Sequence, residues 1–125
     1  MQTPNNAPTT TVPLYRLAHS RTGDKGDISN ISVIAWTPAY FPLLRDQLTE
    51  DAVQDWFSFR KPRRVKRYIV ESISAMNFVL EGILDGGVND ALNLDTHGKA
   101  LSFYLLDIPI MVSTQLADTL PDIQT

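Results

Sequence analysis

Apolar and polar residues alternate with a period of two in several stretches of the chain, a pattern typical of half-buried β-strands. Residues 14–19 alternate in this way and are expected to form the first strand. β-Branched and aromatic residues predict further strands at residues 31–36 and 65–73, with a short one at residues 91–94. Because residues 20–30 are polar and contain two glycines, they are predicted to form a loop between the first two strands.

Apolar residues recur at three- and four-residue spacing in other stretches, which predicts helices. The first helix is expected to begin at Pro38, because proline lacks an N–H and the first N–H of a helix has no partner in any case. The second helix is expected to follow Thr49, which acts as its N-cap. A third helix is predicted after Ser74, and a last one from residues 97–98 to a stop at Pro109.

With the two consecutive helices after Pro38 and Thr49 counted as one, the predicted order of elements is β-β-α-β-α-β-α. This order allows a layer of helices to cover one face of a mostly antiparallel or mixed sheet. The order therefore predicts an α+β fold, a two-layer ferredoxin-like α/β sandwich. We expect a single domain over residues 13–112. It lies between a disordered N-terminal arm at residues 1–12 and a loosely held C-terminal tail at residues 113–125.

Composition removes several classes of function. The 125 residues include 11 Lys and Arg, 14 Asp and Glu and no Cys, with a net charge of -3, so neither nucleic acid nor a membrane is an expected partner. Without cysteine there are no disulfides or thiolate nucleophiles, and the two histidines, far apart in sequence, predict no metal site. The sequence contains no apolar run of about 20 residues and its start does not resemble a signal peptide, so we expect a soluble, cytoplasmic protein.

Basic residues concentrate at residues 60–67, the one strong local charge feature of the sequence. No aromatic residue interleaves with them, so stacking on nucleic-acid bases is not expected. A solvated or partner-facing loop is the favoured interpretation, and an anionic cofactor such as coenzyme A is an alternative.

The predicted loop that follows the first strand contains the densest set of reactive side chains. Its glycines would let the backbone take positive φ angles and approach a ligand, and its cations would favour an anion. Its carboxylates oppose a phosphate and favour a cation or an acid/base pair, while an ordinary turn also explains the same residues. The candidate catalytic residues are His19, Asp24 and Lys25, and the candidate ligand-binding residues are Ser20, Arg21, Gly23, Gly26, Asp27 and Asn30.

Three later residues are further candidates for ligand binding. His97 and Lys99 lie at a predicted helix start, where free N–H groups and the lysine would attract a carboxylate or phosphate, although an ordinary helix cap also explains them. Asn77 lies within the predicted third helix, where a buried amide would need partners. It either aligns the glycine-containing loop or bonds locally near the helix start.

Several ordered motifs resemble the small domain of the acyclic terpene utilisation (AtuA-like) family. The resemblance runs from about residue 17 to residue 106, and its motifs lie at residues 20–27, 30–35, 65–68, 76–82, 86–88 and 94–99. It implies a ferredoxin-like domain that usually follows a large N-terminal domain, in proteins associated with degradation of acyclic terpenes such as citronellol and geraniol. The matching positions are Gly23, Asp24, Lys25, Gly26, Asn30, Asn77, Gly86, Gly87, His97 and Lys99.

This chain departs from the family pattern at two positions. Asp27 stands where many relatives have Asn, and Asp85 stands where a further Gly is frequent. The added negative charges weaken a phosphate-binding interpretation. The resemblance transfers no catalytic role to any residue.

Three functional hypotheses follow. The first is a small subunit or accessory domain that docks on a larger AtuA-type subunit and binds a carboxylate or acyl-CoA ligand in terpene-related acid catabolism. The second is a stand-alone lyase, hydratase or isomerase whose site forms between identical subunits from His19, Asp24 and Lys25. The third is a structural oligomerisation module, which predicts no ligand. The sequence identifies no cofactor.

Overall fold

The computed structural model describes residues 8–25, 28–82 and 100–120 of the chain. The strands are β1 (Thr9–Pro13), β2 (Ala18–Lys25), β3 (Ile28–Ala35), β4 (Arg64–Val70), β5 (Ala75–Glu81) and β6 (Pro109–Ser113). The α-helices are α1 (Phe41–Gln47), α2 (Glu50–Trp56), α3 (Ala100–Leu105) and α4 (Thr114–Thr119). Short 3-10 helices are η2 (Leu14–Arg16), η3 (Pro38–Tyr40), η4 (Ser58–Arg60) and η5 (Glu71–Ile73).

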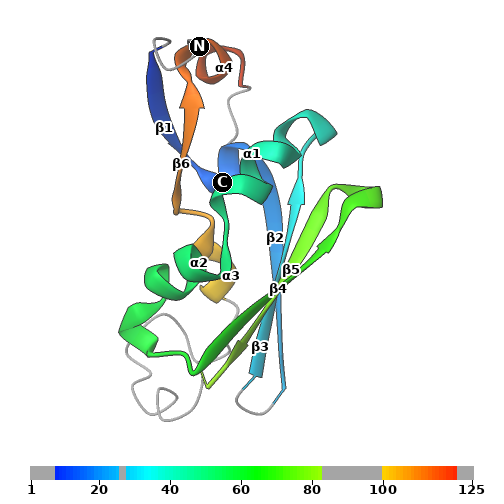
Figure 1. Cartoon of the computed structure of the whole chain (residues 1–125), viewed down its shortest axis with the longest axis vertical. Helices are drawn as coiled ribbons and strands as arrows, with labels where there is room; N and C mark the ends of the chain where they lie inside the picture. The colour runs from blue at the N-terminus through cyan, green and yellow to red at the C-terminus, as the bar shows by residue number, and fades with distance from the viewer. Residues whose placement is uncertain (1–7, 26–27, 83–99, 121–125) are drawn as a thin grey trace.

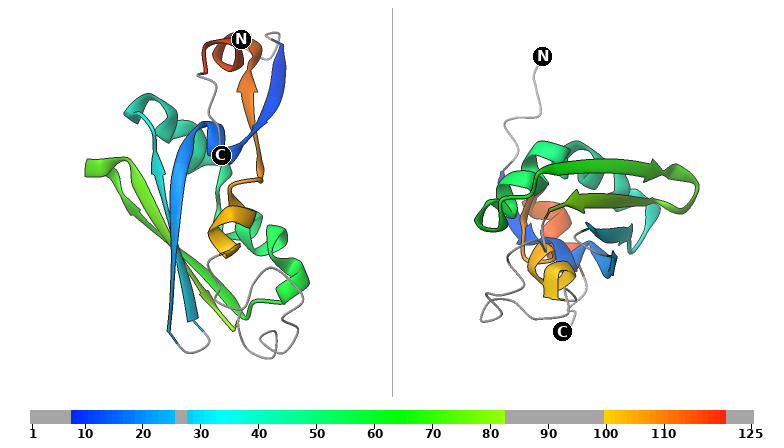
Figure 2. Two further views of the ribbon diagram at one scale, coloured as in Figure 1. Left: turned by 180° about the vertical axis from the view of Figure 1, so that it is seen from behind. Right: turned by 90° about the horizontal axis from the view of Figure 1, so that it is seen from below.

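A four-stranded antiparallel sheet in the order β2-β3-β5-β4 forms one layer, and helices lie on one side of it (Figures 1 and 2). Helix α2 contacts the edge strand β4, and α3 contacts β2 and β3. The predicted α+β class with a ferredoxin-like two-layer arrangement is therefore confirmed. Among the described residues, no helix is long and apolar enough to cross a bilayer.

The core lies between the sheet and the helices because alternate strand residues point to one face. Ile31 and Val33 of β3 and Phe78 and Leu80 of β5 are almost fully buried. Burial of each such side chain contributes about 1.5–3 kcal/mol, which makes this face the main source of stability. The helical side is supplied by Leu44, Leu48, Val53, Phe57, Leu101 and Leu105.

A two-stranded ribbon of β1 and β6 carries α4 and projects from the main sheet (Figure 1). Ser113 caps α4, because its side chain accepts a hydrogen bond from the N–H of Leu116 at 3.1 Å. Strand β1 thus begins within residues 1–12, which were expected to be disordered, and α4 lies within residues 113–125, which were expected to be loosely held. The reason is that the ladder with β6, distant in sequence, pairs the backbone of β1 although few of its residues are apolar.

The helix predicted after Ser74 is wrong, because residues Ala75–Glu81 form the strand β5. Ser74 has a φ of 55° and closes the turn between β4 and β5 rather than capping a helix. Met76, Phe78 and Leu80 are buried and alternate with polar or half-buried neighbours. The observed burial therefore follows the period of two of a strand and not the three- and four-residue spacing from which a helix was predicted. Asn77 therefore lies on a strand.

The loop predicted at residues 20–30 is also wrong. Strand β2 continues to Lys25 and β3 starts at Ile28, so this stretch is a β-hairpin, and the predicted start of the first strand is instead η2. Gly, Asp and Asn have low strand propensity, but pairing with β3 over the whole length of β2 overrides that preference.

The remaining element predictions divide into two groups. Helices after Pro38 and Thr49, the strand within residues 65–73 and the last helix are confirmed as η3 with α1, α2, β4 and α3. The Thr49 hydroxyl accepts a hydrogen bond from the N–H of Ala52 at 3.1 Å, as an N-cap should. The strand predicted at residues 91–94 and the helix start at residues 97–98 lie outside the described residues.

Candidate functional site

The face of the four-stranded sheet that points away from the helices is the candidate site, and we call it the outer face. No described element covers it (Figures 1 and 2). The strand register arranges its residues in rows that run across β2, β3, β5 and β4. Three of these rows are His19, Ile34, Ala75, Val70; Arg21, Ser32, Asn77, Tyr68; and Gly23, Asn30, Val79, Lys66.

Five of the residues selected from the sequence lie together on the outer face: His19, Arg21, Gly23, Asn30 and Asn77. They occupy three neighbouring rows, although up to 58 positions separate them in the sequence (19 to 77). Directly opposed residues on one face of an antiparallel pair have Cβ atoms about 4.5–5.5 Å apart. The hairpin and β5 thus gather these side chains into one surface.

The row through Arg21 is the polar centre of the outer face. Arg21 is exposed, and no described residue forms an ion pair with it. Ser32 and Asn77 follow it in the row, each half-buried, and the row ends at the exposed Tyr68. A guanidinium, a hydroxyl, an amide and a phenol therefore stand in line, which is a set of donors suited to carboxylate oxygens.

Gly23 contributes to this surface by its small size and not by an unusual backbone. Among the described glycines only Gly82 has a positive φ, so the prediction of a positive φ at Gly23 is wrong. A Cβ atom added at Gly23 would lie 3.5 Å from Oδ1 of Asn30, its partner across the hairpin. The missing side chain leaves the amide of Asn30 exposed beside the Arg21 row.

An aromatic pair borders the polar centre. The ring centroids of His19 and Trp36 are 4.7 Å apart with the planes tilted by 34°, and the Trp36 Nε1–H donates to the carbonyl of Tyr15 at 3.1 Å. His19 is half-buried and Trp36 is exposed. Trp36 was not selected from the sequence. Because it directly follows the buried Ala35, alternation along the strand predicts that its side chain lies on the outer face.

Ser20 lies apart from the other candidates because strand alternation turns it toward the helices. Its Oγ is buried and has no hydrogen-bond partner in the described part of the chain. Thr22, on the same side, accepts a hydrogen bond from the N–H of Ser102 at 2.9 Å and so anchors α3. The inner side of β2 is thus part of the helix packing.

The three candidate catalytic residues do not meet within one copy of the chain. His19 lies near the start of β2, while Asp24 and Lys25 are its last two residues. With a rise of about 3.4 Å per residue, five or six residues separate them by about 17–20 Å along the strand. Gly26, Asp27, His97 and Lys99 lie outside the described residues, so the structure does not place them.

The basic cluster at residues 60–67 is divided between the two faces. Arg64 and Lys66 lie on the outer face, whereas Arg67 lies on the helix side. The Arg67 guanidinium donates to the carbonyls of Arg45 and Leu48, both at 2.7 Å, at the end of α1. The cluster is therefore not one anion-binding loop.

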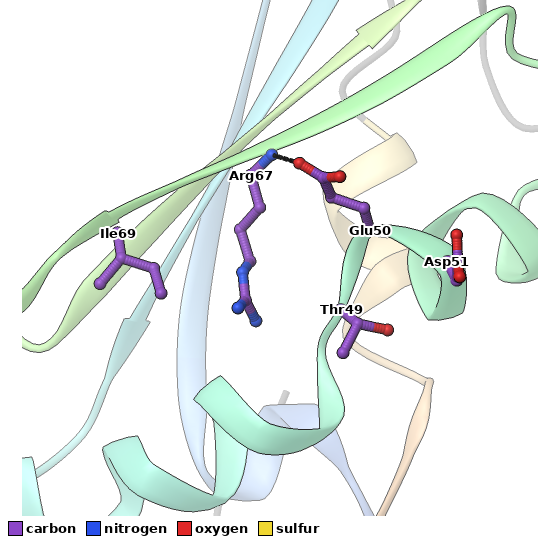
Figure 3. Close-up of a pocket in the computed structure, with 5 residues that line it drawn as sticks. All are labelled: Thr49, Glu50, Asp51, Arg67 and Ile69. Atoms are coloured by element: carbon purple, nitrogen blue, oxygen red, sulfur yellow. Dashed lines mark hydrogen bonds between the residues drawn. The ribbon is translucent and has the colours of Figure 1, made fainter.

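Arg67 also lines the cavity of about 500 Å³ shown in Figure 3, between β4 and the start of α2. Its backbone N–H donates to Oε2 of Glu50 at 2.8 Å. Thr49, Asp51 and Ile69 complete the lining. Because the one cation of this cavity is bound to helix carbonyls and two carboxylates line it, the cavity is a weaker site for an anion than the outer face. The described residues also contain no group of three His, Asp or Glu that could hold a metal ion.

The fold and the outer face define a small α+β domain that presents an open, polar sheet surface. The family model of the AtuA ferredoxin-like domain matches residues 12–111, which is most of the chain. The chain therefore belongs to this family and is an AtuA-related accessory domain. Neither the curated proteins nor the solved structures gave a match.

Proposed function

We propose that this accessory domain binds a carboxylate, free or as the acyl thioester of coenzyme A, on its outer face. It does so in association with a larger AtuA-type polypeptide, in terpene-related acid catabolism. The observation that carries the proposal is the row of Arg21, Ser32 and Asn77, which presents an exposed cation beside two neutral hydrogen-bonding side chains.

The chemistry of this row suits a carboxylate. A guanidinium offers two parallel N–H donors to the two carboxylate oxygens, and the neighbouring hydroxyl and amide can complete the remaining hydrogen bonds. Lys66 in the adjacent row adds a second positive charge on the same face. An open sheet face also has room for the long acyl or pantetheine part of a thioester.

A stand-alone lyase, hydratase or isomerase is less well supported. The distance along β2 from His19 to Asp24 and Lys25 requires a second copy to bring these groups together. A structural oligomerisation module is also less well supported, because it gives no reason for an exposed Arg21 beside Ser32 and Asn77.

Titration calorimetry and thermal unfolding test the proposal with a panel of branched-chain carboxylates and their coenzyme A thioesters. A ligand present at about 100 times its Kd adds about 2.7 kcal/mol of stability, which is readily measured. Arg21→Gln is expected to weaken binding about 10- to 100-fold, because a hydrogen bond to a charged group contributes about 1.5–3 kcal/mol.

Lys61→Gln is the matched control, since it removes one exposed positive charge from the connection between η4 and β4 and not from the outer face. It is expected to bind like the wild type. The proposal fails when no member of the panel binds, or when both variants lose affinity equally, because the effect would then reflect overall charge.

A further inference from the structure

The outer face has an apolar end that the proposed ligand site does not use. Trp36, Val70 and Ile73 are 50%, 44% and 60% exposed. They lie at the same end of the sheet, because the N–H of Ala35 donates to the carbonyl of Ser74 at 3.0 Å and holds the end of β3 against the turn that contains η5. Large apolar side chains that are exposed together mark an interaction surface, whereas scattered ones do not.

Positive charge adjoins this apolar end at Arg21, in the next row, and continues toward the opposite end of the sheet at Lys66 and Arg64, two and three rows away. Arg21, Arg64 and Lys66 share the outer face, and Glu81 is the acidic residue among its described side chains. The surface therefore combines an apolar end with cations on its two edge strands, β2 and β4. Its complement is a protein surface with apolar side chains bordered by carboxylates.

We infer that the outer face is the docking surface for such an acidic patch on the larger AtuA-type polypeptide. The inference rests on the proposed function, which supplies that polypeptide as the partner. Docking covers Trp36, Val70 and Ile73 and reaches Lys66, so it also covers the Arg21 row that lies between them. A carboxylate bound there is then partly shielded from water, which strengthens its interaction with the guanidinium.

Two other occupants fit the surface less well. Face-to-face stacking of two copies brings the cations of both copies together, and like charges oppose each other across an interface. Nucleic-acid bases stack on aromatic rings, but the exposed rings of this face are Tyr68 on the edge strand β4 and Trp36 after β3, which lie in different rows, and the chain has a net charge of -3.

The area of the face sets the expected affinity. Four strands about 4.8 Å apart, with about seven residues each rising about 3.4 Å, cover about 450 Å² in projection. A standard interface buries about 800 Å² on each partner, so this one is at the small end of the range. We therefore expect a micromolar, reversible complex and not an obligate one.

Sedimentation velocity of the chain mixed with the purified larger AtuA-type polypeptide tests the inference. Ile73→Asp places a charge in the apolar end, and Lys66→Glu reverses one cation, so each is expected to raise the Kd about tenfold or more. Met111→Asp is the matched control, because Met111 is 54% exposed on β6, outside the four-stranded sheet, and this variant is expected to bind like the wild type. Raising salt from about 50 to about 300 mM is expected to weaken the wild-type complex more than the Lys66→Glu complex.

The outcomes separate this inference from the proposed function. If the complex forms but Ile73→Asp and Lys66→Glu bind like the wild type, docking occurs elsewhere and the inference is overturned while the association stands. If the wild type does not associate but still binds carboxylates through Arg21, the docking inference fails alone. Self-association that Ile73→Asp abolishes, or binding of a single-stranded oligonucleotide that Lys66→Glu abolishes, would assign the face to another occupant and also overturn it.

Discussion

Arg67 is the residue whose replacement should destabilise the domain most clearly through a single side chain. Its guanidinium donates to two carbonyls at the end of α1, those of Arg45 and Leu48, at 2.7 Å each. Hydrogen bonds that involve a charged group contribute about 1.5–3 kcal/mol each. Because Arg67 is only half-buried and water can replace it in part, the lower figure applies, and Arg67→Met should cost about 3 kcal/mol.

Urea unfolding followed by circular dichroism measures this loss. With a slope of about 1.5 kcal/mol per molar urea, the unfolding midpoint of Arg67→Met should fall by about 2 M. Arg67→Lys keeps the charge, but its side chain is shorter than that of arginine, whose Nη1 donates both hydrogen bonds, so it should recover about half of the loss. Lys66→Met is the matched control, since Lys66 is the preceding cation and points to the opposite face.

The reasoning is refuted if Arg67→Met unfolds within about 0.5 kcal/mol of the Lys66→Met control, the range expected of an ordinary surface substitution. Such a result would mean that water satisfies the end of α1 as well as the guanidinium does. The cluster at residues 60–67 would then regain a role as a solvated basic loop. Reduced affinity for carboxylates in Arg67→Met, with stability unchanged, would likewise contradict a purely structural role.

Three further changes have defined expected effects. Gly82→Ala should lower the free energy of unfolding by about 1–2 kcal/mol in urea titrations, because φ at Gly82 is +81° and the new Cβ would lie 2.8 Å from Nη1 of Arg63. Gln47→Ala should cost about 1 kcal/mol, measured by thermal unfolding, since the Gln47 amide accepts from the N–H and donates to the carbonyl of Met111, both at 2.8 Å; an unchanged midpoint would show that water replaces both bonds. Asn77→Thr should stabilise the domain by about 0.5 kcal/mol while weakening carboxylate binding, and a loss of stability would show that the amide is needed by the fold.

The parts of the fold that were predicted correctly have local signals. Thr49 before two acidic residues predicts the start of α2, and the predicted cap is present. Pro38 predicts a helical start for the same kind of reason, because its effect is confined to its own turn. Such elements need no knowledge of which distant segment they contact.

The parts that were mispredicted depend on partners distant in sequence. The hairpin of β2 and β3 contains residues with low strand propensity, and it is extended because each residue of β2 has a partner in β3. In β5 the buried Met76, Phe78 and Leu80 define a strand only once the neighbouring strands β3 and β4 are known. Apolar residues around Phe78 also recur at the three- and four-residue spacing of a helix, so periodicity alone favoured a helix where the structure has a strand.

The candidate site was predictable in its residues but not in its geometry. Arg21, Asn30 and Asn77 could be selected by their residue type. Whether they share one face depends on the strand register, because a slip of one residue moves every side chain of a strand to the opposite face. The same alternation separates Ser20 from its neighbours His19 and Arg21, which no composition argument could do.

The outer face is also a place where local preference and structure disagree, and that disagreement bears on function. Gly23, Asn30 and Asn77 are poor strand formers within a four-stranded sheet, and no described hydrogen bond of the Asn30 or Asn77 side chain offsets this cost. The inner face of the same strands is packed with apolar residues, so the fold does not need these three residues for its stability. Residues that reduce stability and cluster on one exposed surface are expected where a protein binds something. The energetics of the sheet thus support the same surface as the register does, by an argument that does not depend on the identity of the ligand.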